Sequence, residues 1–171
     1  MFYLLELTHT IKLHPSFFGP NIRNFIRSKL LADVEGTCDG QYGYIICVLN
    51  SDSLDIPPGK IIQGQGVAEF RVAYQAIVWK PFKGEVVDAI VSVVNKMGFF
   101  ADAGPLSVFV STHLLPSELK FEPTANPPNY SGDDMQVERG SKVRLKLVGT
   151  RVDATEIFAI GTMKEDYLGA L

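Results

Sequence analysis

Three cations alternate with apolar residues near the carboxyl end of this 171-residue chain: Lys142, Arg144 and Lys146. Alternation with a period of two places them on one face of a β-strand, about 7 Å apart. This spacing is close to that of successive phosphates along a single nucleic-acid strand, and cations that bind phosphates release counterions. The pattern therefore favours contact with a nucleic-acid backbone.

Two interpretations of this basic strand stay open. It belongs to a run from 139 to 151 that holds five basic residues and no acidic one, and Arg151 ends the run. The alternative is a solvated face whose cations pair with carboxylates such as Glu138 or Glu156, because exposed charges usually have no special role. The formal net charge of −3 argues against a chain that binds polyanions over its whole surface.

A second candidate for nucleic-acid contact is the segment Gly98-Phe99-Phe100-Ala101-Asp102, which Val108-Phe109-Val110-Ser111 follows. Together the two segments resemble the RNA-binding OB-fold module first known from the largest small-subunit ribosomal protein. The resemblance implies that the glycine permits a sharp bend and that Phe100 points outward and stacks on a base. Stacking suits single strands because every base offers a π-face, and it contributes about 1–3 kcal/mol per base.

The sequence departs from that module at two positions. The module carries a second exposed aromatic residue near Ala103 and commonly a histidine where Val110 stands. Aromatic side chains mostly serve burial, and we expect Phe99 and Phe109 in the core. For Phe100, burial and outward stacking both stay open. Together with the basic strand, this pattern favours weak, sequence-tolerant contact with single-stranded RNA.

An unusual loop, His14-Pro15-Ser16-Phe17-Phe18-Gly19-Pro20, marks the first half of the chain. Its prolines and glycine exclude regular structure, and two adjacent phenylalanines cannot easily both turn inward. We expect one of them to be exposed and held in shape by the prolines, as suits an interface anchor. The alternative is a plug that folds back over the neighbouring helix. Both interpretations also apply to the loop from 57 to 66, where Ile61 and Ile62 lie among glycines.

Signatures of catalysis are missing from the sequence. It has no Gly-x-Ser-x-Gly elbow, no phosphate-binding loop ending in Gly-Lys-Ser/Thr and no His-Glu-x-x-His motif. Paired carboxylates such as Asp133-Asp134 and Glu165-Asp166 are most simply solvated surface. We therefore expect no catalysis and no cofactor. We also expect no metal site, because the histidines and cysteines do not lie at the spacings of metal ligands: His9, His14, His113, Cys38 and Cys47.

Composition places the chain among globular proteins, with 46% hydrophobic and 20% charged residues. No stretch approaches the roughly 20 apolar residues of a membrane span. The first residues lack the basic start and the small-residue cleavage site of a secretory signal. We therefore expect neither a membrane protein nor a secreted one, and we interpret the cysteines as reduced, in the cytosol or nucleus.

Hydrophobic periodicity predicts a βαββ arrangement for the first half of the chain. The expected elements are a strand over 3–13, a helix over 22–34 that Asn21 caps and Gly36 ends, a hairpin of 37–38 with 44–49, and a strand over 68–78. The apolar stripe of the helix is expected to comprise Ile22, Phe25, Ile26, Leu30 and Val34.

The pattern restarts at Pro81-Phe82-Lys83-Gly84, where we expect a domain boundary. Strands are predicted over 85–95, 98–103, 106–112, 142–152 and 156–164, with a long polar loop from 122 to 136 that holds Asn126. Five short strands in about 80 residues fit a small barrel of the oligonucleotide-binding type better than a sandwich.

Four segments of the chain resemble the family of stalk subunits of RNA polymerases. They are the opening strand, the loop from 14 to 20, the segment Lys80 to Asp88 and the ending Ile160 to Gly169. The likeness runs over essentially the whole chain. The ending favours the branch of the family formed by the seventh subunits of eukaryotic RNA polymerase II, over the archaeal, polymerase I and polymerase III branches.

This resemblance implies an α+β fold, with a truncated ribonucleoprotein-like domain over 1–80 and a five-stranded OB-fold barrel over 81–171. It implies a non-catalytic subunit of a nucleotidyl-transferring complex, which pairs with the polymerase's fourth subunit to form a stalk beside the RNA exit channel. It also implies a nuclear protein of transcription initiation and elongation, with a link to mRNA decay in cytoplasmic processing bodies.

The resemblance also assigns surfaces to residues of this chain. Those expected to dock on the polymerase core near the clamp are Pro15, Phe17, Phe18, Gly19, Pro20, Ile61 and Ile62. Those expected to contact emerging single-stranded RNA are Phe100, Lys142, Arg144, Lys146 and Arg151. The alternative is a free-standing RNA-binding OB-fold adaptor, of exosome or translation-factor type. Such an adaptor calls for a full aromatic and histidine set on the barrel face.

Overall fold

The computed structural model describes residues 1–49, 51–123, 127–132, 135–153 and 155–171. The chain forms two compact units, an amino-terminal unit over Met1–Lys80 and a carboxyl-terminal unit over Pro81–Leu171. Within the described ranges, no helix is both long enough and apolar enough to cross a lipid bilayer.

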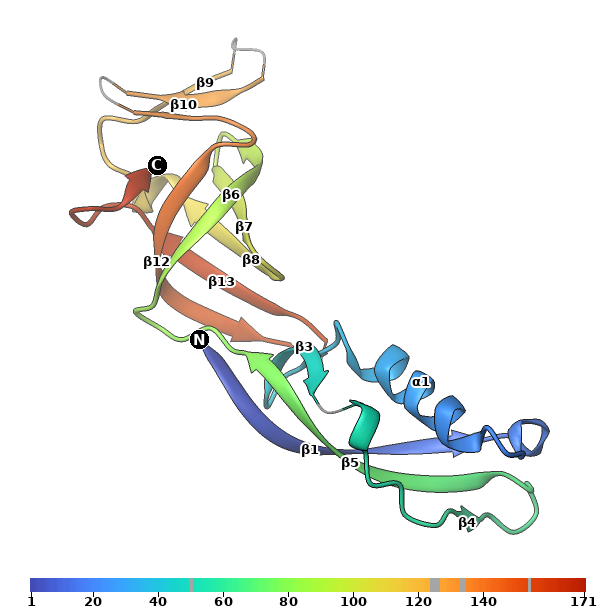
Figure 1. Ribbon diagram of the computed structural model, residues 1–171. Helices are drawn as coiled ribbons and strands as arrows, with labels where there is room; N and C mark the ends of the chain where they lie inside the picture. The colour runs from blue at the N-terminus through green and yellow to red at the C-terminus, as the bar shows by residue number, and fades with distance from the viewer. Residues whose placement is uncertain (50, 124–126, 133–134, 154) are drawn as a thin grey trace. The chain divides into compact units, whose positions relative to one another are not determined.

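The amino-terminal unit is built on two long antiparallel strands, β1 (Phe2–Leu13) and β5 (Ala68–Trp79). They pair without interruption from Phe2 opposite Trp79 to Leu13 opposite Ala68, as the period-two pattern of both segments predicts. The sheet continues in the order β1-β5-β3-β2, with the short strand β4 also paired to β5 (Figure 1). The bounds of the shorter strands are Cys38–Asp39 for β2, Gly43–Leu49 for β3 and Lys60–Ile61 for β4.

Helix α1 (Ile22–Val34) lies along one face of this sheet (Figure 1). Its buried residues are Ile26, Leu30 and Val34, which pack in one core with the inward side chains of β1 and β5. Two details of the predicted helix are wrong. The Asn21 side chain makes no capping hydrogen bond, and Phe25 is exposed because it falls at the edge of the stripe that Ile26 centres.

The carboxyl-terminal unit is a closed five-stranded barrel, as predicted. Its strands run in the order β13-β8-β7-β6-β12, and a further pairing of β12 with β13 closes the ring (Figure 1). All neighbours are antiparallel except β8 and β13. The bounds are Val86–Asn95 for β6, Gly98–Ala103 for β7, Leu106–Ser111 for β8, Lys142–Val152 for β12 and Ile157–Thr162 for β13.

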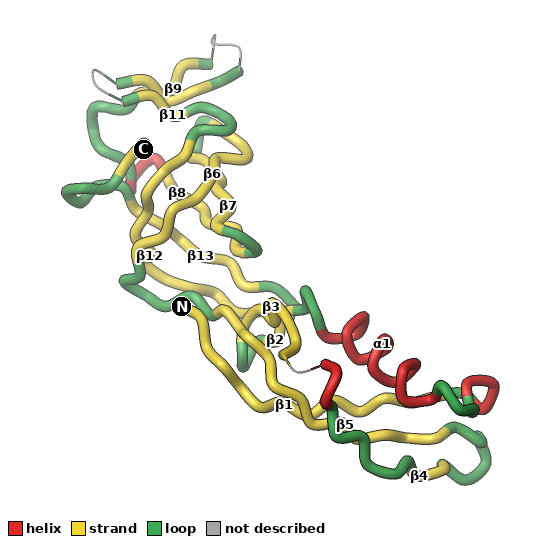
Figure 2. The backbone as a smooth tube through the Cα atoms, viewed as in Figure 1, coloured by secondary structure: helices red, strands yellow, loops and turns green. Residues whose placement is uncertain are grey.

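Several short elements were not predicted from the sequence. The expected loop from 122 to 136 instead contributes to a small sheet of β9 (Lys120–Glu122), β10 (Asn129–Ser131) and β11 (Gln136–Val137), shown in Figure 2. Tyr130 anchors that sheet, since its buried side chain donates a hydrogen bond to the Asn95 carbonyl oxygen at 2.6 Å. Asn126 and the pair Asp133-Asp134 lie outside the described residues.

Other short elements occur where the helix and strand propensities of the residues do not indicate regular structure. They are the 3-10 turns η1 (Pro15–Phe17), η2 (Ser51–Ser53) and η3 (Thr112–Leu114), and the terminal strand β14 (Gly169–Ala170), which pairs with β12.

Gly98 opens β7 in a conformation that only glycine adopts easily, with φ +145°. A Cβ at this position would collide with the carbonyl oxygen of Val110 on β8, which is backbone and cannot rotate away. We predict that Gly98→Ala destabilises the barrel by on the order of 3 kcal/mol. Amide hydrogen exchange in β7 and β8 of the full chain measures this effect.

Gly104 provides the matched control for this prediction. It also has a positive φ, +62°, but an added Cβ there meets nothing within 4 Å. Gly104→Ala should therefore cost only about 1 kcal/mol. Equal exchange in the two variants would show that the approach of β7 to β8 is not the reason for the glycine.

Candidate nucleic-acid and protein interfaces

The cations of the basic row, defined as Lys142, Arg144 and Lys146, lie on the outer face of β12. Asp88 on β6 lies directly opposite Arg144 in the strand register. The Arg144 guanidinium donates to both carboxylate oxygens of Asp88, from Nε at 2.7 Å and from Nη2 at 3.0 Å. This bidentate pair engages the middle cation of the row.

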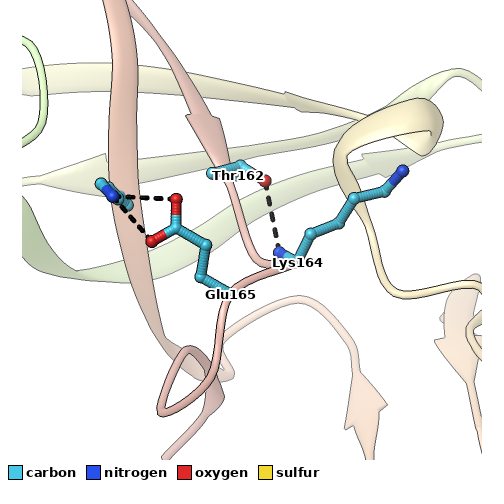
Figure 3. A network of polar contacts seen from close by, with 4 residues as sticks. Thr162, Lys164 and Glu165 are labelled. Carbon is cyan, nitrogen blue, oxygen red and sulfur yellow. Dashed lines mark hydrogen bonds and ion pairs between the residues drawn. The ribbon is translucent and has the colours of Figure 1, made fainter.

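A second carboxylate engages Lys146. Its Nζ donates to both oxygens of Glu165, at 2.8 Å and 2.6 Å, and the dashed lines that end on Glu165 in Figure 3 mark these contacts. The interpretation that the cations pair with nearby acids therefore describes Arg144 and Lys146. The partners are therefore not Glu138 and Glu156, which the sequence suggested: strand register brings Asp88 opposite Arg144, and the segment that follows β13 brings Glu165 to Lys146.

Two of the predicted RNA-contacting cations, Lys142 and Arg151, are not engaged in this way. Within the described parts of the chain, neither Lys142 nor Arg151 has a carboxylate at ion-pair distance. Arg151 reaches the outer face because of a bulge in β12 between Leu147 and Gly149. Without this bulge, strict alternation would turn Arg151 inward with the buried Leu147.

Phe100 is 37% exposed on the outer face of β7, whereas its neighbour Phe99 is fully buried. The outward orientation that the resemblance to the RNA-binding OB-fold module implies for Phe100 is therefore present in the structure. Phe109, expected in the core, is only half-buried. It lies beside Phe100, with ring centroids 4.8 Å apart at an angle of 43°. A pair of aromatic rings thus faces outward here.

An apolar row crosses the outer face of the barrel through this pair. Strand register aligns Val93, Phe100, Phe109 and Ile160 as neighbours on β6, β7, β8 and β13. Val93 and Ile160 are each about half exposed. The row therefore spans four strands of the barrel.

A groove of about 490 Å³ adjoins this row at β13. It is lined by Phe109, Phe158, Ile160 and Arg151, together with Gly149, Thr150, Asp153 and Ala159. Phe158 is 46% exposed and lies opposite Arg151 in the register. Sequence reasoning missed Phe158 and Ile160 because the strand Ile157–Thr162 is apolar on both faces and carries no alternation to read.

The two departures from the RNA-binding module have a structural explanation. Ala103 and Val110 are both buried in the barrel. The outward positions beside them are Asp102 and Ser111. The second aromatic side chain and the histidine of the module are therefore absent from these outward positions as well.

At the end of the sheet where β1 finishes, Phe17 and Phe18 are 45% and 42% exposed. Pro15 begins the 3-10 turn η1, and the His14 side chain caps it by accepting a hydrogen bond from the Ser16 amide. Phe17 also packs edge-on against Phe25 of α1, with centroids 5.5 Å apart. The alternative, a plug that folds back over the helix, describes Phe17 only in its contact with Phe25, because both phenylalanines remain exposed.

The loop from 57 to 66 meets the same end of the unit. Ile61 on β4 is 70% exposed, and Ile62 is half-buried. A Cβ placed on Gly66 would lie 3.6 Å from Pro15 Cγ, so the two loops are in contact range. We call the loops 14–20 and 57–66 together the tip. The structure brings the predicted docking residues together there.

A further apolar surface escaped sequence analysis. On the sheet face away from α1, Phe2 and Leu4 are both more than half exposed. The ring of Phe2 packs against the buried Trp79, with centroids 6.5 Å apart. Tyr44 on the neighbouring strand β3 also packs against Trp79, with centroids 6.1 Å apart. We call this surface the apolar end of the sheet.

Metal ligands do not gather anywhere in the described ranges: no group of three or more His, Cys, Asp or Glu side chains is placed to hold an ion. The interfaces described above consist of exposed aromatic, aliphatic and basic side chains.

Comparison with known proteins decides the family. Residues 8–66 match the profile described as "SHS2 domain found in N terminus of Rpb7p/Rpc25p/MJ0397", and residues 80–159 match "S1 RNA binding domain". The chain is 68% identical to DNA-directed RNA polymerase II subunit rpb7 of Schizosaccharomyces pombe, over 99% of both chains. The chain belongs to the Rpb7 family of RNA polymerase II subunits.

More distant Rpb7 relatives align over nearly the whole length as well. The subunit RPB7 of Saccharomyces cerevisiae is 47% identical over the full length of both chains. The archaeal DNA-directed RNA polymerase subunit Rpo7 of Sulfolobus acidocaldarius is 22% identical over this whole chain and 93% of its own. The family, the polymerase II branch and the order of an α+β domain before an OB-fold, all predicted from sequence, are confirmed.

The Arg144–Asp88 pair has a measurable signature. Hydrogen bonds from the Arg144 guanidinium hold the pKa of the Asp88 carboxyl below its ordinary value of 3.8. Desolvation opposes this effect, and the positive charge of Arg144 adds to it. Because the folded-state pKa is lowered, the pair stabilises the fold above the ordinary pKa. That stabilisation is lost as the pH falls through the folded-state pKa.

We predict that Arg144→Gln returns the pKa of Asp88 toward its ordinary value in a carboxyl NMR titration. Arg151→Gln removes the same charge from β12 without touching Asp88 and should leave that pKa in place. An unchanged Asp88 titration in the Arg144 variant would show that the pair does not form in solution.

Proposed function

We propose that this Rpb7-family chain acts as a non-catalytic stalk subunit of RNA polymerase II. It pairs with the fourth subunit, docks on the polymerase core near the clamp, and contacts emerging RNA during initiation and elongation. The observation that carries the proposal is the exposure of Phe17 and Phe18 at the tip, since rigid aromatic side chains of this kind serve as interface anchors.

Docking through the tip follows from its shape and chemistry. The predicted docking residues lie on two loops that come into contact at Gly66 and Pro15, and the prolines and the 3-10 turn restrict the backbone there. A preorganised apolar surface loses little conformational entropy when a partner covers it. The exposed members that supply contact area are Phe17, Phe18 and Ile61.

We predict that Phe18→Ala weakens attachment to the core by about 2 kcal/mol, or roughly 30-fold in Kd, because a hot-spot anchor is lost. The measurement is recovery of core subunits with the tagged chain in high salt, where apolar contacts dominate. The barrel should stay folded. Met97→Ala, which truncates an exposed apolar side chain of the other unit, is the control. Undiminished recovery of the core with the Phe18 variant would contradict the docking role.

Pairing with the fourth subunit is best served by the apolar end of the sheet. Exposed Phe2 and Leu4 lie on β1, which ends the strand order β1-β5-β3-β2, and a strand in that position can pair with a strand of another protein. Apolar surface of this kind makes an isolated subunit prone to association, and co-expression with its partner relieves this tendency.

RNA contact is assigned to the outer face of the barrel, which supplies both stacking rings and cations. Phe100 and Phe109 form an outward aromatic pair, and the neighbouring groove sets Phe158 beside Arg151. Stacking on aromatic rings with a few nearby cations is the sequence-tolerant mode of single-strand binding. Of the predicted cations, Lys142 and Arg151 are open to phosphates, whereas Arg144 and Lys146 are engaged by carboxylates.

Two variants separate the stacking and phosphate contributions. Phe100→Ala should lower affinity for single-stranded RNA by about 1–3 kcal/mol and leave the salt dependence unchanged. Arg151→Gln should reduce the slope of log K against log salt by about 0.7, because one phosphate contact is lost. Fluorescence anisotropy over a salt series measures both quantities.

Arg23→Gln, which removes an exposed cation from the amino-terminal unit, controls for net charge. If the Arg151 and Arg23 variants shift the slope equally, Arg151 is not part of the RNA site.

The place of action follows from the assembly. A subunit of RNA polymerase II works in the nucleus, and we propose cytoplasmic processing bodies as a second location.

A further inference from the structure

We infer that Asp88 and Glu165 occupy phosphate positions on the basic row and thereby set a low affinity of the barrel for single-stranded RNA. The inference rests on the RNA contact proposed above and assigns a role to two acidic residues. Each carboxylate engages a cation that would otherwise face solvent on β12.

In both pairs the carboxylate makes contacts that a phosphate group also makes. Arg144 donates two parallel hydrogen bonds of 2.7 and 3.0 Å to the Asp88 carboxylate. A guanidinium binds a phosphate in the same arrangement. Lys146 holds both oxygens of Glu165 within 2.8 Å. The two cations stand two residues apart, roughly 7 Å, which is close to the phosphate spacing of a single strand.

Both pairs are open enough to exchange partners. The side chains of Arg144 and Asp88 are 42% and 55% exposed, and those of Lys146 and Glu165 are 34% and 55% exposed. Ion pairs at such a surface contribute little free energy, so a phosphate can displace the carboxylate. RNA therefore competes with the two acids for Arg144 and Lys146, while Lys142 needs no displacement.

The polypeptide keeps Glu165 in place by two anchors. Upstream, the Met163 amide donates to the Leu114 carbonyl oxygen at 3.0 Å. Downstream, β14 pairs with β12 at Gly169 opposite Arg144. The Leu168 amide also donates to the Glu165 carbonyl oxygen at 3.3 Å, which closes the turn. Because the segment is held on both sides, Glu165 competes as a tethered anion, and its local concentration does not depend on salt.

The test compares affinities of the full chain for a fluorescein-labelled oligouridylate over a salt series. Asp88→Asn and Glu165→Gln each free one cation, and each should tighten binding roughly two- to fivefold at fixed salt. Each should also steepen the slope of log K against log salt by about 0.7. Asp166→Asn is the matched control, since it removes the same charge next to Glu165 without freeing a paired cation.

A double variant separates a local effect from a general change of charge. Lys146→Gln combined with Glu165→Gln should lose the gain seen with Glu165→Gln alone, because no cation is left to meet the phosphate. Amide exchange of Gly169 and Ala170 confirms that the terminal segment stays paired with β12 in each variant.

Three results would overturn the inference. They are an equal gain in Asp166→Asn, a gain that survives in the double variant, and unchanged affinity in both single variants while the unaltered chain binds RNA. If neither the unaltered chain nor any variant binds the oligouridylate, the proposed RNA contact itself fails. The two failures are therefore distinguishable.

Discussion

Closure of the barrel by β12 is the constraint on which the outer surface depends. This strand pairs with β6 along its first half and with β13 along its second. With both edges occupied, its side chains cannot exchange inside for outside, so Val143, Leu145 and Leu147 fill the interior and the cations between them face solvent. The bulge after Leu147 then reverses the alternation and brings Arg151 out beside Phe158.

The tip and the barrel offer different physical means for the contacts proposed above. At the tip, restricted loops hold Phe17 and Phe18 in place before any partner arrives, which favours a durable interface with slow dissociation. On the barrel, much of the local positive charge is neutralised by Asp88 and Glu165, although the run from 139 to 151 contains no acid. A half-neutralised face with stacking rings suits transient contact with RNA of any sequence.

The sequence predicts most of the fold because its signals are local. Period-two alternation predicts β1 and β5, and the succession of five strands predicts the barrel. The prolines around Phe17 and Phe18 correctly predict an exposed loop, although that pattern says nothing of what covers it. Phe25 was placed in the core because a helical stripe has no sharp edge in the sequence, and only packing decides its rim.

The features that were missed depend on long-range register. Asp88 lies 56 positions from Arg144, so no spacing rule connects them. A bulge carries no marker in the sequence, and the outward face of Phe158 follows only from pairing with β12. The most direct test of the whole account is hydroxyl-radical footprinting of the free chain, the assembled polymerase and the polymerase with a transcript. The account predicts protection of Phe17 and Phe18 on assembly, and protection of Phe158 only when RNA is present. Equal reactivity of Phe17 and Phe18 in the free chain and in the polymerase would contradict it.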